Sequence, residues 1–270
     1  MKSKWIKGLA TVCGAIFFST LGIFAADSMQ GIRGTFMNVA NVGKSTDVCA
    51  VGMVPVKSGD YMLCVDQYEA SPSEQCVHKV LMNALQSEEN TNTPECYAQS
   101  AKDVVPWNYI SLPQAQRMCA GAGKRLPTSK EWFDIALGTT PEGCTVLSKN
   151  VDVTGNETCV SRAGAYDAIG NVWEWVDESV VNSSFDGRIL PLEGYITSVD
   201  ANGVAITSNS NPDPVYGNDY FWSKPEGVFG MIRGGFYASG DDSGLYAVYA
   251  SVPTSFVTQG VGFRCVEDLI

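Results

Sequence analysis

The residues that could bind a soft metal or act as nucleophiles are nine cysteines and one histidine, His78. No two cysteines form a Cys-x-x-Cys pair, and a single histidine cannot complete a zinc site, so the sequence predicts no zinc. Cys13 lies in an apolar N-terminal run, which leaves an even number of cysteines in the rest of the chain. In an exported chain such a set predicts disulfides. The eight cysteines are Cys49, Cys64, Cys76, Cys96, Cys119, Cys144, Cys159 and Cys265.

The N-terminus has the composition of an export signal. Lys2, Lys4 and Lys7 precede an apolar run over residues 8–25. Residues 1–26 are therefore predicted to be either a cleaved signal peptide or an N-terminal membrane anchor, since the run is close to the minimum length for a span. Both alternatives predict an exported domain that is secreted, periplasmic or on the cell surface.

The remainder of the chain predicts one domain. Residues 27–47 are polar and without periodicity, as in a linker, and residues 48–270 show neither a repeat nor a second boundary. The chain is 45% hydrophobic, which is enough for a sizeable core, and its 27 glycines and 12 prolines indicate many turns. We expect a loop-rich α+β fold.

The net charge of −11 bears on the class of partner. The three N-terminal lysines are not matched by any acid before residue 26, so a processed chain would be more acidic still. An acidic surface repels phosphate backbones, and we therefore expect no nucleic-acid partner.

Two helices and one hairpin have clear local signals. A helix is predicted over 111–121, with Ser111 as its cap, and a second over 129–137, where Thr128 and Glu131 form a capping box. Residues 51–65 predict two short strands around a turn at 58–60. Residues 71–103 are expected to form a long loop, and residues 182–224 a weakly patterned insertion.

The segment from Phe236 to Thr258 has an unusual alphabet. Its 23 residues include no Lys, Glu, Gln, Met or Trp. These are the residues that codons ending in a pyrimidine cannot encode. Such a segment between the conserved-looking frames Arg233-Gly-Gly235 and Gly262-Phe-Arg-Cys265 indicates a binding surface that has been diversified at its adenines.

Four blocks of the sequence resemble one family. They are Gly123-Lys-Arg-Leu-Pro-Thr-Ser-Lys-Glu-Trp132, Tyr166-Asp-Ala-Ile-Gly-Asn-Val-Trp-Glu-Trp175, Arg233-Gly-Gly235 and Gly262-Phe-Arg-Cys265. In this order they resemble the formylglycine-generating enzyme (sulfatase-modifying factor) domain. The resemblance implies a variant of the C-type lectin fold and a disulfide between Cys119 and Cys265. For the other cysteines we expect the pairs Cys144–Cys159, Cys76–Cys96 and Cys49–Cys64.

The chemistry of that family needs groups that this chain lacks. The oxidases use two cysteines shortly after the Arg-Gly-Gly motif, but no cysteine follows Gly235 before Cys265. A sister branch binds iron through three histidines, and only His78 is present. We therefore expect neither copper nor iron and no catalytic residue.

Within the family, the chain resembles the variable proteins of diversity-generating retroelements, whose diversified codons lie between these two motifs. The resemblance implies a ligand-binding protein whose partner is a protein or a glycan on another cell, a virus or a host. Tyrosine and serine, which are frequent here, suit such surfaces. The predicted ligand-binding residues are Tyr237, Ser239, Asp241, Asp242, Tyr246, Val248, Tyr249, Ser251, Ser255, Phe256 and Thr258.

A calcium ion is the one cofactor that the resemblance leaves open. Asp167, Gly170, Val172 and Glu174 occupy positions where relatives bind calcium. Oxygen-only ligands suit this hard cation. The alternative is that Asp167 and Glu174 satisfy backbone amides of the turn. Two other functions also remain open: a family enzyme or accessory protein with a non-standard active site, and a structural protein of the cell envelope.

Overall fold

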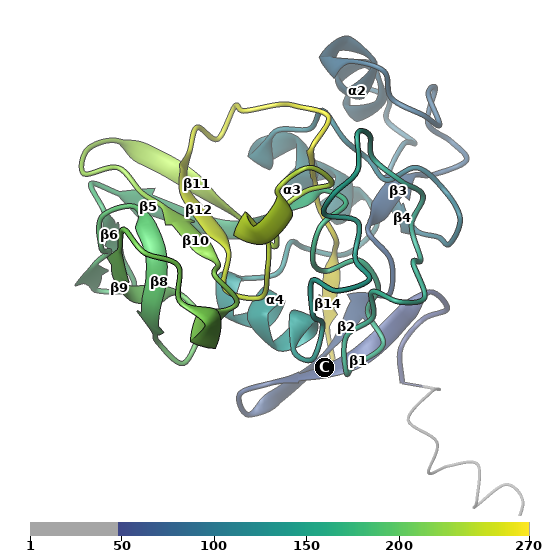
Figure 1. The fold of residues 1–270 in the computed structure, drawn as a ribbon. Coiled ribbons are helices and arrows are strands. Elements are labelled where there is room, and N and C mark those ends of the chain that lie inside the picture. The colour runs from purple at the N-terminus through teal and green to yellow at the C-terminus, as the bar shows by residue number, and fades with distance from the viewer. Residues whose placement is uncertain (1–47, 270) are drawn as a thin grey trace, which may run out of the picture. The chain divides into compact units, whose positions relative to one another are not determined.

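The computed structural model describes residues 48–269. The predicted signal or anchor over 1–26 and the predicted linker over 27–47 lie outside this range. The described part contains three α-helices and two 3-10 turns (Figure 1): α2 (Ala84–Thr91), α3 (Leu112–Gly121), α4 (Ser129–Ala136), η2 (Pro214–Tyr216) and η3 (Gly240–Asp242).

A nine-stranded mixed sheet forms the larger part of the domain, in the order β7-β6-β5-β11-β12-β10-β8-β9, with β13 paired to β5. Its strands are β5 (Trp173–Val181), β6 (Ser184–Phe185), β7 (Arg188–Ile189), β8 (Gly194–Val199), β9 (Ala205–Asn209), β10 (Tyr220–Trp222), β11 (Val228–Arg233), β12 (Val248–Val252) and β13 (Val261–Gly262). The strand β12, which lies in the codon-restricted segment 236–258, pairs antiparallel with β11 and parallel with β10. The segment is therefore built into the middle of the sheet.

Helices cover the two faces of this sheet. Trp175 and Ile232 are register partners and pack with buried residues of α3, including Met118. Their chain neighbours Val176 and Met231 point to the opposite face, where the core contains Trp132 of α4. Because side chains alternate along a strand, both faces of β5 and β11 are buried.

Two small sheets complete the domain. The hairpin of β1 (Met53–Ser58) and β2 (Tyr61–Asp66) pairs with β14 (Val266–Asp268), so the two ends of the described chain meet in one sheet (Figure 1). A separate two-stranded sheet joins β3 (Ala70–Pro72) to β4 (Ala98–Ser100). No helix of residues 48–269 has the length and hydropathy needed to cross a bilayer.

The structure confirms the elements that have strong local signals. Ser111 and Thr128 cap α3 and α4, and both helices begin with a capping box. The hairpin forms around the predicted turn. The fold is α+β, loop-rich and disulfide-bonded, as predicted.

Two stretches were predicted wrongly. Residues 71–103 contain α2 and β4 rather than only a loop, because Asn83 caps a helix through its side chain, which accepts a hydrogen bond from Gln86 N. Residues 182–224 are no separate insertion, since β8 and β10 extend the main sheet. β10 pairs with β12, and β8 pairs with β10, so these strands form through long-range pairing and not through a local sequence pattern.

All four expected disulfides are present: Cys49–Cys64, Cys76–Cys96, Cys119–Cys265 and Cys144–Cys159. Cys119–Cys265 joins α3 to the residue before β14 across 146 positions of sequence. It therefore links the first half of the domain to its C-terminal strand.

Candidate ligand-binding site

Arg233 of the Arg-Gly-Gly motif is fully buried. Its guanidinium forms hydrogen bonds with α4, with the β8–β9 turn and with residue Leu245 of the stretch 236–258. Its Nη1 donates to the backbone oxygens of Ser129, at 2.9 Å, and Asn202, at 3.0 Å. Its Nη2 donates to those of Gly203, at 2.9 Å, and Leu245, at 3.2 Å. Burial lowers the pKa of Arg233 to about 9. The guanidinium thus fastens the segment to α4 and to the β8–β9 turn.

The two glycines of the motif make a turn that other residues could not. Both have positive φ, +93° at Gly234 and +90° at Gly235. A Cβ at Gly234 would lie 2.5 Å from the oxygen of Ala168, and one at Gly235 would lie 2.2 Å from the Cβ of Ser243. The chain can leave β11 in this direction only with glycine at both positions.

Main-chain hydrogen bonds hold the two loops of residues 236–258, one before β12 and one after it. Tyr237 N donates to Asn171 O at 2.9 Å, and Ser148 N donates to Tyr237 O at 2.6 Å. At the other end, Tyr109 N donates to Thr258 O at 2.9 Å. These bonds do not depend on which side chains the segment carries. These contacts therefore hold the backbone at Tyr237 and Thr258 without using the side chains of those two residues.

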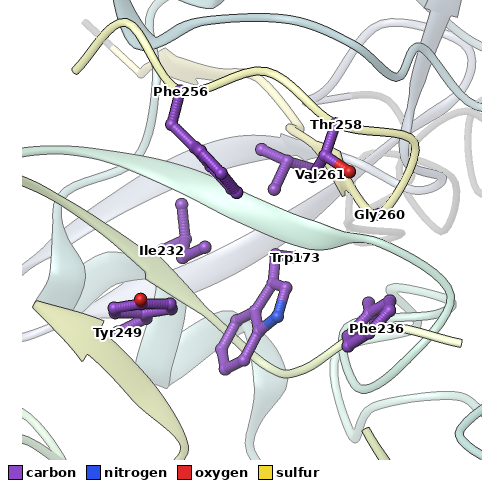
Figure 2. Close-up of a pocket in the computed structure, with 8 residues that line it drawn as sticks. All are labelled: Trp173, Ile232, Phe236, Tyr249, Phe256, Thr258, Gly260 and Val261. Carbon is purple, nitrogen blue, oxygen red and sulfur yellow. The ribbon is translucent and has the colours of Figure 1, made fainter. Parts of the chain in front are cut away.

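An apolar hollow of about 240 Å³ lies between the loop that follows β12 and the main sheet. Figure 2 shows the side chains around it, with Phe256 on the loop and Trp173, Ile232 and Tyr249 on three strands. Phe236 and Thr258 complete the rim. A cavity with such walls suits an apolar or aromatic group of a ligand.

A second hollow, of about 250 Å³, adjoins the first and is more polar. It shares Trp173, Phe236 and Tyr249 with the first hollow. Its other walls include Trp222 and Asp242. The two hollows together place an aromatic surface beside a carboxylate.

Most of the predicted ligand-binding residues reach the surface. Those that are exposed or partly exposed are Tyr237, Ser239, Asp241, Asp242, Tyr246, Tyr249, Ser255, Phe256 and Thr258. The structure brings five of them together around the hollows: Ser239, Asp242, Tyr249, Phe256 and Thr258.

The other six predicted residues line neither hollow, although Tyr237, Asp241 and Ser255 are at the surface. Val248 is completely buried and Ser251 is 2% exposed, because β12 has other elements packed on both of its faces. Their side chains are therefore not part of the displayed surface. The ring of Tyr246 packs at 5.8 Å from that of Phe133 and at 5.5 Å from that of Tyr216, outside the lining of either hollow.

The sequence prediction missed several residues of the hollows. Trp173 lies in the motif block at 166–175, and Phe236 is the first residue of the stretch 236–258, but neither is among the predicted ligand-binding residues. Trp222 comes from the stretch that was expected to be an insertion. Only the register between Trp222 and Tyr249 brings these distant positions to one face.

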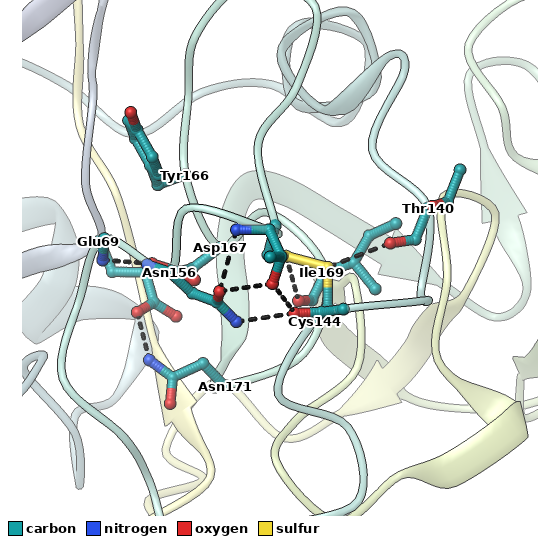
Figure 3. Close-up of a disulfide and its surroundings, with 12 residues drawn as sticks. Glu69, Thr140, Cys144, Asn156, Tyr166, Asp167, Ile169 and Asn171 are labelled. Atoms are coloured by element: carbon teal, nitrogen blue, oxygen red, sulfur yellow. Dashed lines mark hydrogen bonds between the residues drawn. A yellow bond between two sulfur atoms is a disulfide. The ribbon is translucent and has the colours of Figure 1, made fainter.

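The two carboxylates considered for calcium already accept hydrogen bonds from other groups of the protein. Both carboxylate oxygens of Glu174 accept hydrogen bonds from Nε of Arg264, at 2.9 and 2.8 Å, and one also accepts from Trp132. The carboxylate of Asp167 accepts from the backbone N–H groups of Gly155 and Asn156 (Figure 3).

The carboxylate of Glu174 is already neutralised by a guanidinium, and calcium would have to displace that cation. Gly170 and Val172 add only backbone oxygens to the predicted set. Within residues 48–269, no three or more His, Cys, Asp or Glu side chains are grouped to hold a metal ion.

Another buried carboxyl, Glu69, lies next to this turn. It accepts a hydrogen bond from Nδ2 of Asn171, at 2.6 Å (Figure 3), and another from Val172 N, at 3.2 Å. Burial raises its pKa well above the usual value, and the charges of Asp167 and Glu174 act in the same direction. Burial also raises the pKa of Asp167 to about 6. These carboxyls hold the turn together through hydrogen bonds.

Comparison with known protein families finds a match for the C-terminal part of the chain. Residues 148–269 match the family model of the sulfatase-modifying factor enzyme 1-like domain. A curated relative, the inactive C-alpha-formylglycine-generating enzyme 2 of Bos taurus, is 25% identical over 150 residues, which cover 42% of this chain and 48% of the relative. The chain thus spans about half the length of this relative.

Solved structures that are similar over most of the chain were also found. The Major Tropism Determinant P3c Variant is 18% identical, with a TM-score of 0.47, over 83% of this chain and 54% of that chain. Variable protein 1 of Treponema denticola is 12% identical, with a TM-score of 0.41, over 82% of this chain and 100% of that chain.

The matched range includes three of the four sequence blocks, at 166–175, 233–235 and 262–265. It also includes both loops of the segment and all the strands of the main sheet. The match to the sulfatase-modifying factor enzyme 1-like domain therefore covers most of the elements that form the two hollows.

Proposed function

We propose that this protein is an exported, catalytically inactive ligand-binding protein that displays a diversified surface over residues 236–258. The observation that carries the proposal is the way in which the segment is held. Main-chain hydrogen bonds with Asn171, Ser148 and Tyr109 hold its two loops. The side chains of Tyr249, Phe256 and Thr258 line a hollow. Such a surface can change its side chains without losing its fold.

The cysteines support an inactive protein. All eight cysteines of residues 48–269 are in disulfides, which leaves no thiol in this range to bind copper or to attack a substrate. The relative in Bos taurus also has "inactive" in its name, although that name describes the relative alone. The four disulfides further support export, because such bonds persist in oxidising compartments.

The ligand of such a surface would be a protein or a glycan. Rigid aromatic side chains such as Tyr249 and Phe256 provide contact area at a low entropic cost, and Ser239 and Thr258 provide adaptable hydrogen bonds. The two hollows present both kinds of group to a ligand.

Sequencing the 3′ end of the gene across its natural population tests the proposal. We expect variation in the codons for exposed positions such as Tyr237, Tyr249 and Phe256, and none at the buried Val248 and Ser251. A near-copy of this stretch and a reverse-transcriptase gene should lie nearby. A segment that is constant across the population, or variation spread evenly along the gene, would overturn the proposal.

A further inference from the structure

Four strands of the main sheet, β8, β10, β12 and β5, contribute a row of neighbouring aromatic side chains. Ring centroids are 5.1 Å apart between Tyr195 and Tyr220, 4.7 Å between Tyr220 and Trp222, and 5.5 Å between Trp222 and Tyr249. Trp173 follows at 6.5 Å from Tyr249. We refer to these five residues as the aromatic row.

The register of the strands places the row on one face of the sheet. Tyr220 of β10 pairs with Tyr195 of β8, and Trp222 pairs with Tyr249 of β12. Phe221, between Tyr220 and Trp222, is completely buried on the other face. The rings of the row therefore point away from the α4 side of the core.

The row is partly open and has a hollow at each end. Tyr195, Tyr220, Trp222 and Tyr249 are all only partly buried. Near β8, a hollow of about 460 Å³ is lined by Tyr195 and Tyr220. At the other end is the hollow of about 250 Å³ that contains Trp222, Tyr249 and Trp173.

Carboxylates stand at both hollows. Glu193 lines the one near β8, and Asp242 lines the one beside Trp222. Both charges reach Tyr220, whose pKa is raised first by burial and then by Glu193, with Tyr195 and Asp242 adding smaller effects. No lysine or arginine is among the residues that line either hollow. The surface thus combines aromatic faces with unpaired negative charge.

We propose that the aromatic row binds the cationic side chains of a basic segment on a protein partner. The negative face of an aromatic ring attracts guanidinium and ammonium groups, and a carboxylate beside the ring adds a direct ionic contact. The net charge of −11 favours a basic partner in the same way. This inference rests on the proposed ligand-binding function and extends its surface from the diversified segment to Tyr195, Tyr220 and Trp222.

The first test compares two peptides that differ only in charge. The purified full chain is titrated with acetyl-Gly-Arg-Gly-Arg-Gly-amide and with the same peptide carrying neutral citrulline in place of arginine, and tryptophan fluorescence reports binding at Trp222 and Trp173. We expect the arginine peptide to bind about tenfold more tightly. Raising the salt from about 0.02 M to about 0.2 M should weaken it several-fold.

Two variants locate the binding. Trp222→Leu and Asp242→Asn should each lower the affinity for the arginine peptide by about tenfold. Glu226→Gln removes an equal charge from an exposed position outside both hollows and should leave the affinity unchanged. Circular dichroism of each variant shows whether it is folded.

Three results would overturn the inference. They are equal affinity for the two peptides, an arginine affinity that the Trp222→Leu and Asp242→Asn variants retain, and binding of a neutral N-acetylglucosamine oligosaccharide at the row in the absence of arginine binding. Population sequencing reports separately on the proposed function. A variable segment without arginine binding defeats only the cation site, and arginine binding with a constant segment defeats only the diversified surface.

Discussion

Arg264 and Glu174 form a fully buried ion pair, in which Nε and Nη2 of the arginine donate to the carboxylate at 2.6 to 2.9 Å. Arg264 also donates to the backbone oxygens of Asp66 and Tyr166. The pair therefore joins β5 to the chain just before β14 and to the turn at Asp167. It also occupies the carboxylate that the sequence offered to calcium.

Removing the charge of Glu174 should be severely destabilising. Glu174→Gln leaves the buried guanidinium of Arg264 without its directly bonded counterion, and breaking a buried pair typically costs about 3–5 kcal/mol. Urea denaturation followed by circular dichroism measures the free energy of unfolding. Glu157→Gln serves as the control, because Glu157 pairs with Lys102 at the surface and its loss should leave the unfolding midpoint unchanged. A small effect of Glu174→Gln would mean that the pair contributes little.

Calcium should not change the thermal stability of the domain. An ion that binds only the folded state at about a hundred times its Kd would stabilise it by about 2.7 kcal/mol. Because Arg264 already neutralises Glu174, we expect the same Tm with calcium in millimolar amounts as with EDTA. A calcium-dependent rise in Tm that is lost in the Asp167→Asn variant would contradict this reading of the site.

Stability should fall as the pH rises from 5 to 8. Burial raises the pKa of Asp219 to about 7 and that of Asp167 to about 6. The folded state therefore binds more protons than the unfolded state between the ordinary pKa and the raised value, so raising the pH through this window favours unfolding. The effect should be on the order of a few kcal/mol, measured by urea denaturation at several pH values.

Asp219→Asn is the matched variant for this pH effect. An amide oxygen can still accept the hydrogen bond from Tyr246 N, which lies 2.6 Å from the Asp219 carboxylate, but it does not titrate. The pH dependence between 5 and 8 should become weaker. If the variant keeps the full dependence, another group is responsible.

Neighbouring residues of β12 should respond differently to truncation. Val248→Ala removes buried methyl groups and should cost about 2 kcal/mol, whereas Tyr249→Ala opens a partly exposed position and should cost less. Tyr237→Ala should also leave Tm nearly unchanged, because the main chain holds its loop. Thermal melts of the three variants provide the comparison. A loss at Tyr249 or Tyr237 as large as at Val248 would make them core residues.

Loss of the long-range disulfide should matter more than loss of a local one. Cys119–Cys265 spans 146 positions and Cys144–Cys159 spans 15. In the chain-entropy model these correspond to about 4–5 and about 3 kcal/mol. Replacing each pair by alanines and measuring unfolding in urea tests the order. Equal losses would show that loop length does not decide the contribution of each bond in this domain.

The sequence by itself determined the features that depend on neighbouring residues. Ser111 and Thr128 predicted the helix starts because a cap acts within one turn, and the turn at 58–60 predicted the hairpin for the same reason. The motif blocks predicted the match to the sulfatase-modifying factor enzyme 1-like domain. The codon-restricted alphabet of residues 236–258 predicted a diversified surface, which stays a prediction. These signals can be read along the chain.

Only the tertiary structure decided which side chains form the site. The pairing of β12 with β10 and β11 buries Val248 and turns Tyr249 outward, and it brings Trp222 beside Tyr249 from a stretch without a local pattern. The partner of Glu174 likewise comes from Arg264, ninety positions away. Contacts of this kind depend on strand register and on the packing of distant residues, and local sequence does not encode either.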